Sequence, residues 1–199
     1  MAGDMNLRKL LVISVLAALL SGCGLLTRDH PGGDEIPPSN HTIGELCNST
    51  KQFFATRAGT ESLKVSPGAG GKVLTDKIGG GNGCFYEMAD GSAWPNLGYV
   101  SLFRIVDGDH TLSQPPPTNE NYPTKVLTVD GVNVKVVTEP LPKGGDPATA
   151  LLTVDLTATI DGWKGELHFR ATEDQTTRDD QLTRAGAQTL VDMIRALKG

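Results

Sequence analysis

LLTVDLTATIDGWKGELHFRA, residues 151–171, decides the fold of this chain. Asp161-Gly162 lies near its middle, and this dipeptide favours a two-residue type I′ turn because both residues tolerate positive φ angles. Apolar and polar residues alternate on both sides of the turn, which is the period of a half-buried strand. The stretch therefore predicts a β-hairpin with strands over residues 151–160 and 163–171.

The register of this hairpin can be checked on both of its faces. One face pairs apolar residues, namely Ile160 with Trp163, Leu156 with Leu167, and Val154 with Phe169. The other face pairs polar residues, namely Thr159 with Lys164, Thr157 with Glu166, and Asp155 with His168. A slip of one residue would mix the two sets, so their agreement predicts an antiparallel sheet with one apolar face.

Further strands are expected outward along the chain. Asp130-Gly131 predicts a second hairpin, again between two alternating runs. The expected strands cover residues 84–89, 97–106, 125–129 and 132–138. The strand over residues 97–106 has apolar residues at both parities, which favours a central place in the sheet.

Helical periodicity predicts one helix at each end of this run of strands. Thr42 and Glu45 have the spacing of a capping box, so the first helix is expected over residues 43 to about 57. The second is expected from about residue 178 to 197, with an apolar stripe along one side. The predicted fold is therefore α+β: a single domain, residues 41–199, in which an N-terminal and a C-terminal helix pack on an antiparallel sheet.

An apolar run over residues 10–20 follows Arg8 and Lys9 near the start of the chain. Eleven residues span only about 17 Å as a helix, against roughly 30 Å for a bilayer core, so a transmembrane helix is disfavoured. An ordinary secretory signal is a second alternative. However, the run ends in Leu-Ser-Gly-Cys at residues 20–23, and this string resembles the lipobox of bacterial lipoproteins.

The lipobox resemblance implies an anchor. Residues 1–22 would be a cleaved signal peptide, and Cys23 would carry a thioether-linked diacylglycerol and an acylated amino terminus. Each buried methylene contributes about 0.8 kcal/mol, so two or three chains hold a protein stably on a membrane. The remainder of 23–40 is rich in Gly and Pro and is expected to be a flexible tether. The resemblance thus implies a protein lipid-anchored to the extracytoplasmic face of the cell membrane.

Two cysteines remain once Cys23 is lipidated. Outside the cytoplasm cysteines tend to pair, so Cys47 and Cys84 are expected to form a disulfide that joins the first helix to the sheet. By the chain-entropy model it would contribute roughly 4 kcal/mol. A metal site and a redox pair are the alternatives, but neither cysteine has a second Cys or His at ligand spacing, and there is no Cys-x-x-Cys. We expect no metal and no cofactor.

Several features resemble a family of small actinobacterial secreted lipoproteins of unknown function. They are Leu46-Cys47 on an early helix, Gly83-Cys84-Phe85-Tyr86 at the start of a strand, the Val-Asp-Gly-Val hairpin at residues 129–132, and the closing helix. The family has no established catalytic residues, so the resemblance implies none for this chain.

Charge and glycine patterns argue against several functions. Removing Asp4, Arg8 and Lys9 with the signal peptide changes the formal charge from −5 to −6. An acidic chain with scattered basic residues is not expected to bind nucleic acid. The glycine-rich segment 68–73 lacks the Ser or Thr of a P-loop, and segment 79–84 lacks the last glycine of a dinucleotide-binding motif.

Two sets of residues remain as candidates for function. His168 opposite Asp155 could act as a general base, but a hydrolase needs a nucleophile, and no Gly-x-Ser-x-Gly or Ser-x-x-Lys occurs. A structural cross-strand ion pair is the alternative. Trp94 lies in a predicted loop and is a possible contact residue for a partner. Pro115, Pro116 and Pro117 form either a polyproline recognition motif or a stiff surface loop.

We therefore expect a non-enzymatic, lipid-anchored cell-envelope protein that binds an envelope protein or an apolar ligand such as a lipid. A hydrolase that uses His168 and Asp155 is one alternative, and a passive structural or antigenic surface lipoprotein is another.

Overall fold

The computed structural model describes residues 39–68, 72–79, 82–90, 96–105, 121–178 and 180–199, with side chains for all of these except 177 and 178. All of them belong to one compact unit, Ile36–Gly199. The helices and the helical turn are α2 (Ile43–Ala58), a π-helical turn (Asp174–Arg178) and α3 (Gln181–Leu197). The strands are β1 (Leu63–Pro67), β2 (Asn82–Met88), β3 (Asn96–Arg104), β4 (Thr124–Val129), β5 (Val132–Thr138), β6 (Leu151–Ile160) and β7 (Trp163–Thr172).

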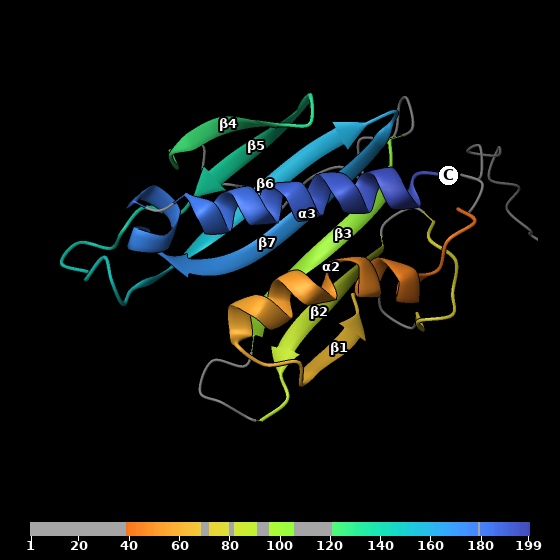
Figure 1. The fold of residues 1–199 in the computed structure, drawn as a ribbon, viewed down its shortest axis with the longest axis horizontal. Coiled ribbons are helices and arrows are strands. Elements are labelled where there is room, and N and C mark those ends of the chain that lie inside the picture. The colour runs from red at the N-terminus through yellow and green to blue at the C-terminus, as the bar shows by residue number, and fades with distance from the viewer. Residues whose placement is uncertain (1–38, 69–71, 80–81, 91–95, 106–120, 179) are drawn as a thin grey trace, which may run out of the picture. The chain divides into compact units, whose positions relative to one another are not determined.

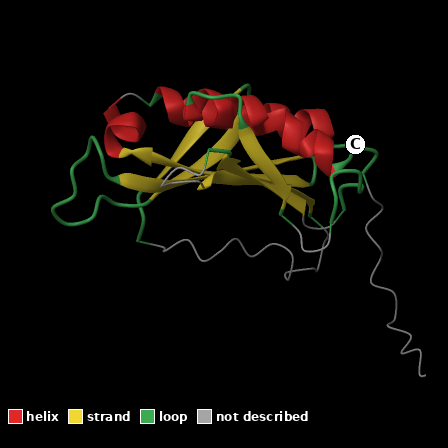
Figure 2. Ribbon diagram, turned by 90° about the horizontal axis from the view of Figure 1, so that it is seen from below, coloured by secondary structure: helices red, strands yellow, loops and turns green. Residues whose placement is uncertain are grey.

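Within these residues the strands form one seven-stranded sheet in the order β1-β2-β3-β7-β6-β5-β4, and every neighbouring pair is antiparallel (Figure 1). Both helices lie on the same face of this sheet (Figure 2). Helix α2 packs on β1, β2 and β3, while α3 packs on β4, β6 and β7 and also contacts α2. The predicted α+β fold, with both helices packed on an antiparallel sheet, is confirmed.

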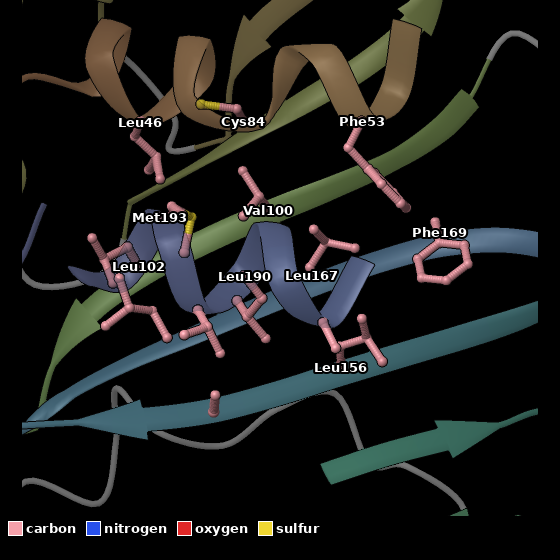
Figure 3. Close-up of a cluster of buried hydrophobic side chains, with 14 of the residues drawn as sticks. Leu46, Phe53, Cys84, Val100, Leu102, Leu156, Leu167, Phe169, Leu190 and Met193 are labelled. Carbon is pink, nitrogen blue, oxygen red and sulfur yellow. The ribbon is translucent and has the colours of Figure 1, made fainter. Parts of the chain in front are cut away.

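The core fills the space between the two helices and the sheet (Figure 3). Leu190 and Met193 of α3 and Phe53 of α2 point toward apolar side chains of the strands, such as Leu167 and Val100. Trp163, predicted to point inward, belongs to this core and is only 8% exposed. None of the helices in the described part of the chain is long and apolar enough to cross a membrane.

Both predicted hairpin turns have the expected backbone. The φ angles are 47° at Asp130 and 80° at Gly131, and 50° at Asp161 and 77° at Gly162. All six cross-strand pairs predicted between β6 and β7 occur in the structure, including Asp155 with His168. The local alternation pattern therefore fixed this register correctly.

The N-terminal end of α2 also follows its prediction. The Thr42 hydroxyl accepts from the Glu45 amide at 3.2 Å, and the Glu45 carboxylate accepts from the Thr42 amide at 2.6 Å, which completes the capping box. Cys47, one helical turn further on, forms a disulfide with Cys84 of β2, 37 residues away in sequence. Both cysteines are buried, so the predicted disulfide lies in the core and joins α2 to the sheet.

One strand was not predicted, and several element bounds differ from the prediction, including those of β2, which covers Asn82–Met88 instead of 84–89. Strand β1 was not expected, because it is only five residues long, ends at Pro67 and pairs with β2 alone. Helix α3 begins at Gln181 instead of 178, since Asp174–Arg178 forms a π-helical turn. Strand β3 ends at Arg104, and it occupies an interior position between β2 and β7, as expected.

Candidate functional site

The sheet face opposite α2 and α3, here called the open face, carries rows of polar side chains. The register aligns these side chains in rungs that cross β3, β7, β6 and β5. One rung consists of Tyr99, His168, Asp155 and Val137. The next consists of Ser101, Glu166, Thr157 and Lys135. Each rung joins residues that are far apart in the sequence, so the site depends on the assembled sheet.

His168 is held on both sides within its rung. Its Nδ1 atom lies 2.5 Å from Asp155 Oδ1, and its ring stacks on Tyr99 with centroids 4.8 Å apart and planes 13° apart. Since a carboxylate can only accept, Nδ1 donates, and Nε2 of the neutral ring is left as an acceptor. Both side chains of this pair are only about a quarter exposed, 25% for His168 and 26% for Asp155. The pair is therefore less solvated than a surface ion pair.

Glu166 of the second rung forms a largely buried ion pair with Lys164, which lies in the following rung beside Phe103 and Thr159. Lys164 Nζ lies 2.8 Å from Glu166 Oε1, and the side chains are 13% and 14% exposed. This oxygen accepts no hydrogen bond from the described residues, so its contact with Lys164 is an ion pair only, while Oε2 accepts from the Ser101 hydroxyl at 3.2 Å. The Lys164 ammonium also lies 5.2 Å from the ring centroid of Phe103, a cation–π contact. The charges of Lys164 and Glu166 thus neutralise each other.

The pKa of the Tyr99 hydroxyl depends on its burial and on the charged side chains of the open face. Burial, and after it the negative charges of Asp155 and Glu166, together raise the pKa of its hydroxyl to about 12. A phenol that ionises this late remains a hydrogen-bond donor at neutral pH. The carboxylates of Asp155 and Glu166 are therefore close enough to act on the Tyr99 hydroxyl.

These side chains line a cavity of about 260 Å³, here called the open-face cavity. Its lining comprises Tyr99, Lys135, Val137, Asp155, Leu156, Thr157, Lys164, Glu166, Leu167 and His168. A shallower depression over β4, β5 and β6 shares Lys135 and Thr157 with it. Partly buried charged groups that converge on one cavity are typical of binding and catalytic sites.

The chemistry available in the cavity is limited. Asp155 orients His168, but the Ser101 hydroxyl donates to Glu166 and makes no hydrogen bond to His168. A Ser–His–Asp relay would need a hydroxyl that donates to the imidazole. Among the described residues, no three His, Cys, Asp or Glu side chains are grouped to hold a metal ion.

The predicted candidates are distributed unevenly over the structure. His168 and Asp155 lie in the open-face cavity, whereas Cys47 and Cys84 lie on the other side of the sheet, under α2. Cys23, Trp94, Pro115, Pro116 and Pro117 lie outside the described residues.

Sequence reasoning missed Tyr99, Lys135 and Lys164 as site residues. Alternation in β5 and β7 places Lys135 and Lys164 on the polar face, and this signal could have found them, whereas β3 is apolar at both parities and gives no such signal for Tyr99. That signal gives no strand order, so it cannot show that these side chains meet.

Comparison of the chain with protein-family models, with curated proteins and with solved structures finds no significant match.

Proposed function

We propose that this chain is a non-enzymatic, lipid-anchored envelope lipoprotein that binds a partner molecule in its open-face cavity. The anchor would be a lipid on Cys23 at the extracytoplasmic face of the cell membrane, and the string Leu-Ser-Gly-Cys at residues 20–23 supports it. The observation that carries the binding proposal is the cavity of about 260 Å³ lined by partly buried charged side chains.

The pairing of charged side chains within the cavity favours a binding function over a catalytic one. Lys164 and Glu166 pair with each other, and so do His168 and Asp155, so the cavity presents oriented hydrogen-bonding groups instead of an activated nucleophile. Because charged and hydroxyl groups of several strands converge on the cavity, we favour a small polar ligand over an apolar one. A polar segment of an envelope protein is the other candidate, with Trp94 and residues 115–117 as proposed contacts.

A hydrolase is the second candidate, because Asp155 orients His168 at 2.5 Å and leaves Nε2 able to take a proton from water. This alternative requires a hydrolytic activity that is lost in His168→Ala and kept in Lys143→Gln, a variant of an exposed residue outside the cavity. If every detected activity survives His168→Ala, the hydrolase is excluded.

The binding proposal can be tested by native mass spectrometry of the full protein extracted from its own envelope under non-reducing conditions. We expect a mass above that of the lipidated chain, carried by a ligand that is lost on denaturation. The same extraction of Tyr99→Ala should recover less of this ligand, because the variant opens one wall of the cavity. Equal recovery from both proteins would contradict binding in the cavity.

A further inference from the structure

The hydrogen-bonding groups that remain unused in the open-face cavity are unevenly placed. His168 Nδ1 and Asp155 Oδ1 bond to each other, Glu166 Oε2 accepts from Ser101, and Glu166 Oε1 is 2.8 Å from the Lys164 ammonium as an ion pair without a hydrogen bond. Asp155 Oδ2 has no partner among the described residues and is an acceptor, and His168 Nε2 also has none and is an acceptor when the imidazole is neutral. One end of the cavity thus offers two neighbouring acceptors, and Tyr99, which stacks on His168, adds one neutral hydroxyl there.

Two carboxylates, those of Asp155 and Glu166, also lie close to that end of the cavity. The hydroxyl of Tyr99, which stacks on His168, has a pKa raised first by burial and then by the charges of Asp155 and Glu166. An ammonium group has three N–H donors and a positive charge, so it can donate to both acceptors and pair with the Asp155 carboxylate. A carboxylate or phosphate at the same place would be repelled by Asp155.

The opposite end has the reverse character. Lys135 of β5 is exposed and makes no ion pair with any described residue, although it lines the cavity. Its ammonium has three donors free for a ligand, and a carboxylate is the matching group. A ligand that reaches both ends would therefore carry a positive group at one end and a negative group at the other.

The register sets the distance between these two ends. Asp155 pairs with Val137, and Lys135 pairs with Thr157, so Asp155 and Lys135 are diagonal neighbours on adjacent strands. Diagonal neighbours of this kind lie about 7–8 Å apart. A molecule with an ammonium and a carboxylate joined by a short chain can reach both, and a cavity of about 260 Å³ suits its size.

We propose that the open-face cavity binds a small zwitterion, an amino acid or a short ω-amino acid, with its ammonium at Asp155 and His168 and its carboxylate at Lys135. This inference rests on the binding function proposed above and names the class of ligand. The rest of the lining, including the Thr157 hydroxyl, would contact the chain between the two charged groups.

Titration calorimetry on the full lipidated protein in detergent tests the inference. The probes are glycine, β-alanine, 4-aminobutanoate and 6-aminohexanoate, compared with butylamine and butyrate, which carry one charge each. We expect at least one zwitterion to bind about 10-fold more tightly than either singly charged probe, since only the zwitterion engages both ends. Equal affinity for butylamine and the best zwitterion would overturn the two-ended arrangement.

Two variants test which end of the cavity binds which charged group of the ligand, and a third variant is the control. Lys135→Met should weaken the best zwitterion about 10-fold while leaving butylamine unchanged, and Asp155→Asn should weaken both. Lys143→Gln removes a lysine that is exposed in the β5–β6 connection, so its affinities should match those of the unaltered protein. Circular dichroism of each variant shows that it is folded.

The outcomes separate this inference from the function it rests on. If no zwitterion binds at about 10 mM while native mass spectrometry finds a ligand that is lost in Tyr99→Ala, the ligand class is wrong and the binding function stands. If neither a zwitterion nor a ligand is found, both proposals fail.

Discussion

At the scale of single residues, Gly98 in β3 occupies the most restrictive backbone position. Its φ angle is +149°, and a Cβ atom there would lie 2.0 Å from the His168 carbonyl oxygen and 2.8 Å from Phe54. We expect Gly98→Ala to lower the free energy of unfolding by more than about 2 kcal/mol, because strain and a backbone clash act together. Urea unfolding measures the change.

Gly131→Ala is the matched control for this prediction. Gly131 also has a positive φ angle, +80°, but nothing lies within 4 Å of the Cβ it would acquire. Its substitution should cost about 1 kcal/mol, from backbone strain alone. Equal losses for the two variants would show that crowding at Gly98 has no effect.

Tyr99 makes stability depend on pH in the alkaline range. Its pKa in the folded protein is about 12, whereas an unfolded tyrosine ionises near pH 10. Below pH 10 both states keep the proton, and the contribution of Tyr99 is complete. As the pH rises from about 10 to about 12, the unfolded chain loses its proton first, so the free energy of unfolding falls.

Urea midpoints between pH 9 and about 11.5 should therefore fall less steeply in Tyr99→Phe than in the unaltered protein. The fall should not vanish, because burial also raises the pKa of Tyr86. Identical slopes for the two proteins would contradict a perturbed Tyr99.

At the scale of elements, the disulfide is the strongest single link between a helix and the sheet. It joins Cys47 of α2 to Cys84 of β2 in the core, beside Tyr86, whose hydroxyl donates to the Cys47 carbonyl at 2.6 Å. The double variant Cys47→Ala/Cys84→Ala should lose up to about 4 kcal/mol of stability, mainly because its unfolded chain is less constrained.

Thermal unfolding with and without dithiothreitol checks this prediction. The unaltered protein should melt at a lower temperature once reduced, and the double variant should melt at the same temperature in both conditions. If the double variant is as stable as the oxidised protein, the bond contributes nothing to the fold.

The elements that could be predicted from the sequence are those defined by local patterns. The β6–β7 hairpin needed only Asp161-Gly162 and two alternating runs, and the start of α2 needed only Thr42 and Glu45. Strand β1 carries only two strongly apolar residues, Leu63 and Val65, before Pro67, so its pattern is too short to distinguish from a loop. It forms a strand because its backbone pairs with β2, which comes later in the sequence.

The candidate site could be predicted only in part, for a related reason. Asp155 and His168 face each other across a local hairpin, so their contact follows from the turn. Tyr99 meets His168 only because β3 pairs with β7, and Lys135 joins them only because β5 pairs with β6. Strand order depends on which packing buries the most apolar surface, and alternation within a strand does not contain it.

At the scale of the whole molecule, the proposed anchor and the proposed binding site are far apart in the sequence. Cys23 precedes the described residues, while every residue of the open-face cavity comes from strands between Asn96 and Thr172. Loss of the lipid should therefore leave binding in the cavity unchanged, and the two proposals can be tested separately.

Lipidation of Cys23 can be tested by metabolic labelling with an alkyne-bearing palmitate in a bacterial host. Cys23→Ser should take up no label, because the thioether requires the thiol, and should keep its signal peptide. Cys47→Ala/Cys84→Ala is the matched control: it removes both other cysteines, so it should be labelled as strongly as the unaltered protein.

Membrane retention alone is a poor readout, because an uncleaved apolar segment over residues 10–20 can itself hold Cys23→Ser at the membrane. Label that persists in Cys23→Ser, or a mature chain that does not begin at residue 23, would refute the lipoprotein proposal.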